Sequence, residues 1–133
     1  MIFTEGQVYT HTFHVTQEVY DSFQVCSQDR NPLHTNEAFA RAKGFPDRVM
    51  YGNILNAFVS FFIGECLEIK NVMIQSQSIN FKKPVFMNDT LDLTAKVDGI
   101  YDSVNTVEFK FAFANIKNGV MVANGKVSIS VMP

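Results

Sequence analysis

Apolar and polar residues alternate with a period of two along most of the second half of the chain. This alternation is typical of strands that have one buried face. The Asn118-Gly119 pair favours a hairpin turn, because both residue types tolerate a positive φ, and Asp102-Ser103 is expected to form the preceding turn. Four strands are therefore predicted, at 72–86, 91–101, 106–116 and 120–132.

The first half of the chain shows one strand-like segment followed by helical patterns. Residues 7–15 are rich in β-branched and aromatic types, which favours a strand. Thr16 is suited to cap a helix that follows this strand. Asn36 is suited to cap a second, short helix, which Gly44 would end.

The longest helical pattern, residues 52–67, is apolar around nearly its whole circumference. Such a helix must be buried nearly all round, so another element has to wrap it. The strands of the second half are the available wrapper. We therefore predict one α+β domain over residues 1–133, with an antiparallel sheet of about five strands wrapped around a long central helix.

Composition and charge narrow the partners that this domain is expected to have. The formal net charge is -2 and no basic run is present, so no nucleic acid is expected as a partner. The most apolar segment, 54–67, is too short and too polar to span a bilayer, so no membrane is expected either. The two cysteines, Cys26 and Cys66, lack metal-ligand spacing. They predict a reduced, cytoplasmic protein that needs no metal.

The stretch SQDRNPLHT, residues 27–35, holds the most distinctive chemistry in the sequence. Asp29 and His34 lie five positions apart, with Asn31 and Pro32 between them. Pro32 restricts Asn31 to an extended or turn conformation. An acid and an imidazole held together by such a loop are suited to general acid–base catalysis. The alternative is structural: Asp29 and Asn31 would be turn formers, and His34 would only precede a helix cap.

Five segments, in this order and spacing, resemble the MaoC-like dehydratase family. They cover essentially the whole chain, and they are FQVCSQDRNPLH (23–34), GFP (44–46), VMYGNIL (49–55), FKKPV (81–85) and NDTL (88–91). Three positions depart from the family pattern. Gln28 stands where the family usually has glycine, Tyr51 where histidine is common, and Asn88 where a second glycine is usual.

The resemblance implies the hot-dog fold and (R)-specific hydration of 2-enoyl-CoA, or the reverse dehydration. Asp29 and His34 are then expected to hold and activate one water. Gly52 would offer its backbone N–H to the thioester oxygen, with Asn31 and Tyr51 also expected at the substrate. No cofactor is expected beyond the thioester substrate itself, which is carried by CoA or by acyl-carrier protein.

Two further expectations concern the surroundings of this site. The side chains of Phe58, Phe61 and Phe62, on the central helix, are expected to border the acyl pocket and to favour short acyl chains. A small chain with several exposed strands, resembling dimeric hydratases, is expected to form a homodimer.

Three other functions are compatible with the same fold. The chain is alternatively a non-catalytic acyl-thioester-binding protein that lost its rate through the changes at Gln28 and Tyr51. It is alternatively a 3-hydroxyacyl-acyl-carrier-protein dehydratase. A hot-dog thioesterase is the third, and the Asp29 and His34 motif argues against it.

Overall fold

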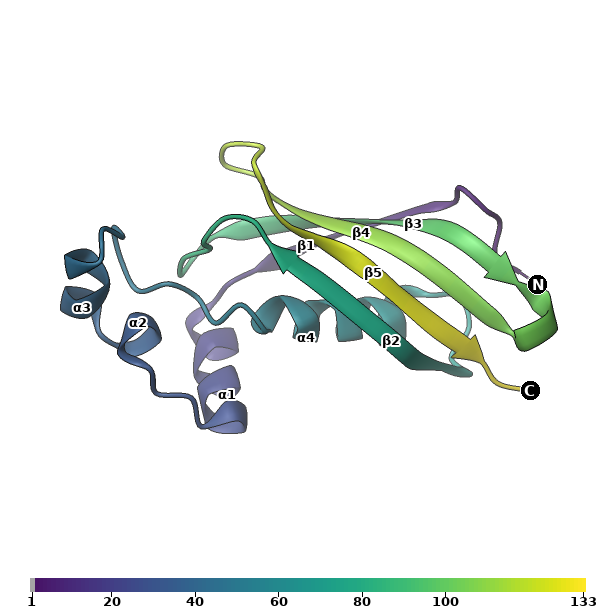
Figure 1. Cartoon of the computed structure of the whole chain (residues 1–133), viewed down its shortest axis with the longest axis horizontal. Coiled ribbons are helices and arrows are strands. Elements are labelled where there is room, and N and C mark those ends of the chain that lie inside the picture. The colour runs from purple at the N-terminus through teal and green to yellow at the C-terminus, as the bar shows by residue number, and fades with distance from the viewer. Residues whose placement is uncertain (1) are drawn as a thin grey trace.

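Five antiparallel strands form a single curved sheet in the computed structural model, which describes residues 2–133. The strand order is β1-β3-β4-β5-β2, so β1 and β2 are the edges (Figure 1). The fold class that the sequence predicts is confirmed. The strands are β1 (Val8–His14), β2 (Val72–Phe81), β3 (Thr90–Tyr101), β4 (Thr106–Asn115) and β5 (Met121–Val131).

The turns between the last three strands lie where the sequence predicts them. A short 3-10 helix, Asp102–Val104, joins β3 to β4, and Asn105 follows it with φ 51°. Gly119 adopts φ 71° in the loop between β4 and β5. The strand predicted at 72–86 is shorter than expected, because it ends at Phe81. Pro84 follows closely, and proline cannot donate to a sheet ladder.

The central helix α4 (Ile54–Phe61) continues as a π-helix, Phe62–Cys66, and lies against one face of the sheet (Figure 1). Its sheet-facing side chains are almost completely buried in the core. The prediction that this helix is buried nearly all round is wrong, since Phe61 remains 42% exposed. The sheet covers one face of the helix, and the opposite face keeps an exposed strip.

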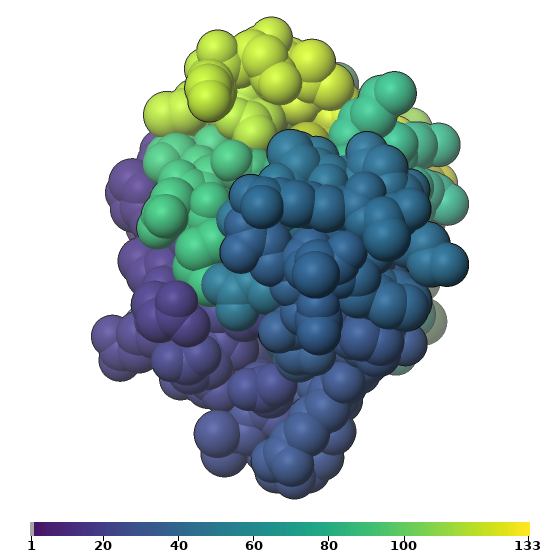
Figure 2. Space-filling model, turned by 90° about the vertical axis from the view of Figure 1, so that its left-hand side faces the viewer, coloured from purple at the N-terminus to yellow at the C-terminus, as the bar shows by residue number. Residues whose placement is uncertain are grey.

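Three helices gather beyond the end of the sheet at which α4 begins (Figure 1). They are α1 (Gln17–Ser27), α2 (Pro32–Thr35) and α3 (Glu37–Ala42). Thr16 and Asn36 cap α1 and α3 through their side-chain oxygens, as the sequence predicts. The blue atoms of this segment occupy the middle of the end face in Figure 2.

No helix within residues 2–133 combines the length and the hydropathy needed to cross a membrane.

Candidate active site

The acid of the motif follows directly on the end of α1. Gln28 ends that helix in the left-handed region, with φ 58°, and its N–H donates to the Gln24 carbonyl. The Gln28 side chain also turns back to the helix, where Nε2 donates to the carbonyl of Val25 at 2.7 Å. Asp29 then accepts the N–H of Asn31 through Oδ1 at 3.0 Å. The chain reversal at Gln28 thus fixes the position of the Asp29 backbone, from which the carboxylate extends.

The one-turn helix α2 carries His34. Asn31 has φ -53° and ψ 131°, which lies within the extended or turn conformations to which Pro32 was predicted to restrict it. Its side-chain oxygen accepts the N–H of Leu33 at 2.9 Å, so Asn31 is the N-cap of α2. This helix was not predicted from the sequence, although an Asn cap followed by a proline at the first helical position is a recognisable signal.

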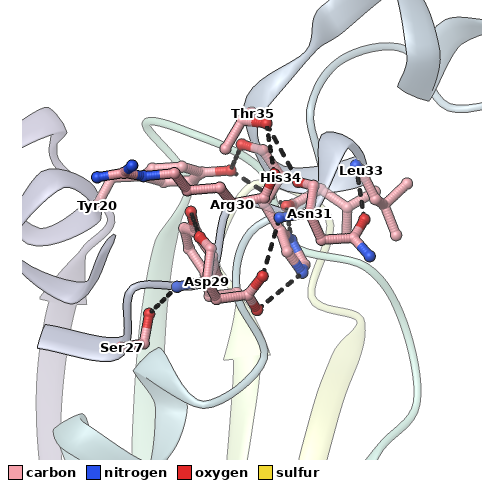
Figure 3. A network of polar contacts seen from close by, with 10 residues as sticks. Tyr20, Ser27, Asp29, Arg30, Asn31, Leu33, His34 and Thr35 are labelled. Atoms are coloured by element: carbon pink, nitrogen blue, oxygen red, sulfur yellow. Dashed lines mark hydrogen bonds and ion pairs between the residues drawn. The ribbon is translucent and has the colours of Figure 1, made fainter. Parts of the chain in front are cut away.

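Asp29 and His34 converge at the centre of this network (Figure 3). The Nδ1 atom of His34 lies 2.7 Å from the carbonyl oxygen of Val49, so Nδ1 carries the proton and donates it. In the neutral imidazole, Nε2 then carries a lone pair, and it lies 4.0 Å from Oδ2 of Asp29. The His34 side chain is 18% exposed and that of Asp29 is 45% exposed, so solvent reaches the pair.

Two buried tyrosines hold the loop that carries this pair. The ring of Tyr51 stacks on His34 with centroids 4.3 Å apart, and its hydroxyl donates to the Asp29 carbonyl at 2.7 Å. The hydroxyl of Tyr20 donates to the His34 carbonyl at 2.6 Å. Burial raises the pKa of Tyr20 to about 12. Burial, together with the Asp29 charge, also raises the pKa of Tyr51.

Both hydroxyls therefore stay protonated at neutral pH and act as donors. Tyr51 was expected to contact the substrate; it lines the cavity, and it also joins the acid to the imidazole. Tyr20 did not enter the predicted site, and its apolar position on a helix gave no signal for a role there.

Gly52 precedes α4 and lies beside His34. Its carbonyl accepts the N–H of Leu55, whereas its own N–H has no acceptor within residues 2–133. A Cβ at this position would approach Cε1 of Phe81 to 3.1 Å, so the close packing of this ring favours glycine. A free N–H at the positive end of a helix is suited to bind a developing negative charge.

Two cavities meet at the candidate site. A cavity of about 280 Å³ contains Asp29 and Tyr51, together with Phe23 and Asn53. A second cavity of about 390 Å³ is lined mostly by residues that the first cavity lacks. Both cavities are lined by His34, Gly52 and Phe81.

The remaining predicted site residues are placed differently from one another. Phe58 lines a third, apolar cavity of about 440 Å³ between α1 and α4, and this cavity shares Phe23 with the Asp29 cavity. Phe61 lies beside His11, with ring centroids 5.0 Å apart, and Phe62 is buried against Phe109. Neither of these rings lines the three cavities, nor does Asn31.

No cluster of three or more His, Cys, Asp or Glu side chains with metal-binding geometry occurs within residues 2–133.

Comparison with known proteins places this geometry in context. Residues 3–117 match the model of the MaoC-like domain. An (R)-specific enoyl-CoA hydratase of Rhodospirillum rubrum is 28% identical over 127 residues, which is 96% of this chain and 87% of that protein. The unliganded R-hydratase of Pseudomonas aeruginosa superposes with a TM-score of 0.88 at 26% identity, over 97% of this chain and 82% of that one.

A third similarity extends over nearly the full length of both chains. The (R)-hydratase of Aeromonas caviae involved in PHA biosynthesis has a TM-score of 0.90 at 23% identity, over 98% of each chain. At this identity the similarity establishes the fold.

Proposed function

This chain belongs to the family of MaoC-like domains, and from that premise we propose that it is a hydro-lyase acting on 2-enoyl thioesters. It adds water across the C2–C3 double bond to give the (R)-3-hydroxyacyl thioester, or removes water in the reverse direction. The name of its Rhodospirillum rubrum relative supports both the reaction and its stereochemistry. The observation that carries the proposal is the paired geometry of Asp29 and His34.

The gap between the two side chains suits one water molecule. At 4.0 Å, Nε2 of His34 and Oδ2 of Asp29 are too far apart for a direct hydrogen bond. Two hydrogen bonds of about 2.8 Å that meet at one oxygen span this gap at an angle of about 90°. A water there donates one hydrogen to the imidazole and one to the carboxylate, which turns its lone pairs towards the substrate.

The reaction needs one proton to travel from the water to C2. As the water oxygen attacks C3, the Asp29 and His34 pair accepts one of its protons and then gives a proton to C2. The second water proton stays on the new hydroxyl group. Positioned acid–base catalysis of this kind contributes typically about 10²–10⁴-fold to the rate. The pair acts as a unit, so the base and the acid are not assigned to separate residues.

The reaction also needs stabilisation of the enolate, and we assign this role to Gly52. Negative charge gathers on the thioester oxygen when C3 is attacked. Gly52, whose N–H has no acceptor within residues 2–133, lines the same cavity as Asp29 and His34 and directly precedes the N-cap of α4. Hydration is not a redox reaction, because the addition of water neither oxidises nor reduces the thioester overall.

Absorbance of crotonyl-CoA in the enoyl band provides the test. Hydration removes this absorbance, whereas a non-catalytic binder leaves it unchanged and a thioesterase releases free thiol. The proposal predicts loss of the band without release of thiol. Unchanged absorbance at micromolar enzyme concentration would contradict the proposal and favour a non-catalytic thioester binder.

We also propose that the protein is a homodimer. β2 is an edge strand that keeps Met73 57% exposed and Phe81 53% exposed, and α4 keeps an exposed apolar strip at Phe61. A second copy that pairs along this edge would cover Met73 and Phe81, whereas Phe61 lies beside His11 of the opposite edge strand, β1. Light scattering at micromolar concentration should report about twice the chain mass of 15.0 kDa. A stable monomer would contradict the proposal.

A further inference from the structure

The cavity of about 390 Å³ next to the candidate site has walls of different character. It starts at His34 and Gly52 and is otherwise mostly apolar. One wall comes from the segment before α4 and the other from the segment after β2. The N–H of Met50 donates to the Val85 carbonyl at 2.8 Å, which holds the two walls together. The cavity is therefore a slot between anchored backbones.

Two lysines line this cavity together with the apolar residues. Lys82 and Lys83 directly follow β2, and the backbone N–H groups of both donate to the carbonyl of Val122, at 2.7 and 3.1 Å. The backbone from which both side chains emerge is thus fixed, and both side chains remain exposed. Two positive charges stand beside a slot that leads to the candidate catalytic pair.

A fourth cavity on the same molecule provides a comparison for these two lysines. Lys110 and Lys126 line a cavity of about 380 Å³ on the sheet, and each lies 3.7 Å from a carboxylate oxygen, of Asp98 and Glu108 respectively. Within residues 2–133, neither Lys82 nor Lys83 has a carboxylate within 4.0 Å. The charge beside the candidate site is therefore uncompensated.

From this arrangement we infer that Lys82 and Lys83 bind a phosphate group of the substrate's pantetheine carrier. The inference rests on the proposed function, because a thioester that reacts at Asp29 and His34 extends from Gly52 into one of the two cavities. Of these two cavities, only the 390 Å³ cavity is lined by lysine side chains. Its apolar walls suit the uncharged pantetheine arm, and the lysines suit the phosphate at the end of that arm.

The direction of the substrate follows from the same charges. The carrier occupies the slot that leads past Lys82 and Lys83, and the acyl chain extends through the Asp29 cavity towards Phe23. Coenzyme A and acyl-carrier protein share the phosphate that ends the pantetheine arm. CoA has a second phosphate in its diphosphate bridge and a third on its ribose. The lysines bind the shared phosphate or one of the phosphates that only CoA carries.

The experiment compares three crotonyl thioesters that differ in phosphate content. They are crotonyl-CoA, crotonyl-phosphopantetheine, which carries one phosphate, and crotonyl-N-acetylcysteamine, which carries none. In the double variant Lys82→Gln/Lys83→Gln, KM for crotonyl-CoA should rise about tenfold, as expected for two partly solvated ion pairs. The kcat value and the kinetics with the phosphate-free thioester should not change.

The outcomes separate the two sources of phosphate. A rise in KM for both phosphorylated thioesters places the lysines at the phosphate that CoA and carrier protein share. A rise for crotonyl-CoA alone places them at the phosphates that only CoA has. An equal change with all three thioesters, or no change, overturns the inference.

A matched control and a binding measurement complete the design. Lys96→Gln/Lys117→Gln removes the same charge from exposed positions that line none of the described cavities, and it should leave every KM unchanged. Calorimetric titration with CoA alone tests the lysines without any reaction. The wild type should bind about tenfold more tightly than the double variant. Equal or undetectable binding would overturn the inference, whereas wild-type failure to hydrate any thioester would overturn the proposed function.

Discussion

Two regions of this molecule hold their shape by different forces. The region where α4 meets the sheet is apolar and almost dry: Phe62 and Phe109 are 1% and 0% exposed, with ring centroids 5.5 Å apart. The loop that carries Asp29 and His34 is partly exposed, and it is held in place by hydrogen bonds within the loop and by the bond from His34 to the Val49 carbonyl. Packing therefore decides whether the chain folds, and directed polar contacts decide whether the catalytic pair is aligned.

This contrast predicts that substitutions divide into two kinds. Changes at the helix–sheet contact should lower stability and leave the reaction of the folded fraction intact. Changes in the loop should do the opposite, because an exposed loop contributes little burial but sets the geometry of the site.

The largest expected effect is on the stability of the core. Phe62→Ala should lower the free energy of unfolding by about 3–5 kcal/mol, because it removes buried apolar surface and leaves a cavity beside Phe109. Urea denaturation followed by circular dichroism measures this loss. Ser60→Ala, at an exposed position of the same helix, is the control and should change stability by less than about 0.5 kcal/mol. A loss for Phe62→Ala no larger than the control's would show that the contact is not a core contact.

The next effect concerns the reaction. Asp29→Asn and His34→Ala should each lower kcat by at least about 100-fold with a modest change in KM, because the lost interactions act mainly in the transition state. The double variant should be little slower than the slower single variant, since the two groups act as a unit. Hydration of crotonyl-CoA provides the measurement, and urea curves should stay close to wild type. Near-normal kcat in both single variants would leave Asp29 and His34 as turn formers.

A smaller effect should follow from loosening the pair without removing it. Tyr51→Phe keeps the ring that stacks on His34 but deletes the hydroxyl that donates to the Asp29 carbonyl. We expect kcat to fall about tenfold, because small displacements of a catalytic group are costly. Tyr51→Leu, which removes the stack as well, should be slower still.

The matched control for this prediction is Tyr9→Phe. The Tyr9 hydroxyl donates to the carboxylate of Glu68, away from the candidate site, at 2.8 Å. Its loss costs the protein one tyrosine hydrogen bond, as at Tyr51, but should leave kcat unchanged. Equal kcat values for the two Phe variants would mean that Tyr51 does not align the catalytic pair.

The core and the loop also differ in how well they can be predicted from sequence, because packing follows periodicity and directed polar contacts do not. The core is encoded by periodicity, so alternation in β4 and the apolar run of α4 were enough to predict the sheet and its helix. What periodicity does not encode is coverage. An apolar residue such as Phe61 has the same pattern whether a sheet, a second copy or solvent lies beside it, and so the exposed strip was missed.

The loop was predictable where a residue acts locally. The conformation of Asn31 follows from Pro32, and the caps at Thr16 and Asn36 follow from their side chains. Contacts between distant positions were not predictable. The spacing of Tyr20 and His34 does not indicate that the Tyr20 hydroxyl donates to the His34 carbonyl. The spacing of His34 and Val49 likewise does not indicate that the imidazole donates to the Val49 carbonyl.

Two of the departures from the family pattern are explained by local backbone conformation. Gln28 and Asn88 both stand where glycine is usual, and both adopt a positive φ, of 58° and 69°. A glycine at either position would adopt this backbone conformation at lower steric cost, which is a backbone role that requires no side chain in the chemistry. The alternative in which Gln28 abolishes catalysis is therefore not supported by its placement, since its side chain turns back to Val25.

The smallest expected effect follows from this placement. In Gln28→Gly, relief of the left-handed strain, about 1–2 kcal/mol, is opposed by the greater freedom of glycine in the unfolded chain and by loss of the bond to Val25. We expect stability to change by less than about 1 kcal/mol and kcat/KM to stay close to wild type. Gln28→Val is the informative partner, because a β-branched side chain tolerates φ 58° poorly. It should destabilise the turn and, through the adjacent Asp29, lower kcat as well. A Gly variant that loses activity while Val keeps it would mean that the Gln28 side chain, and not its backbone, serves the reaction.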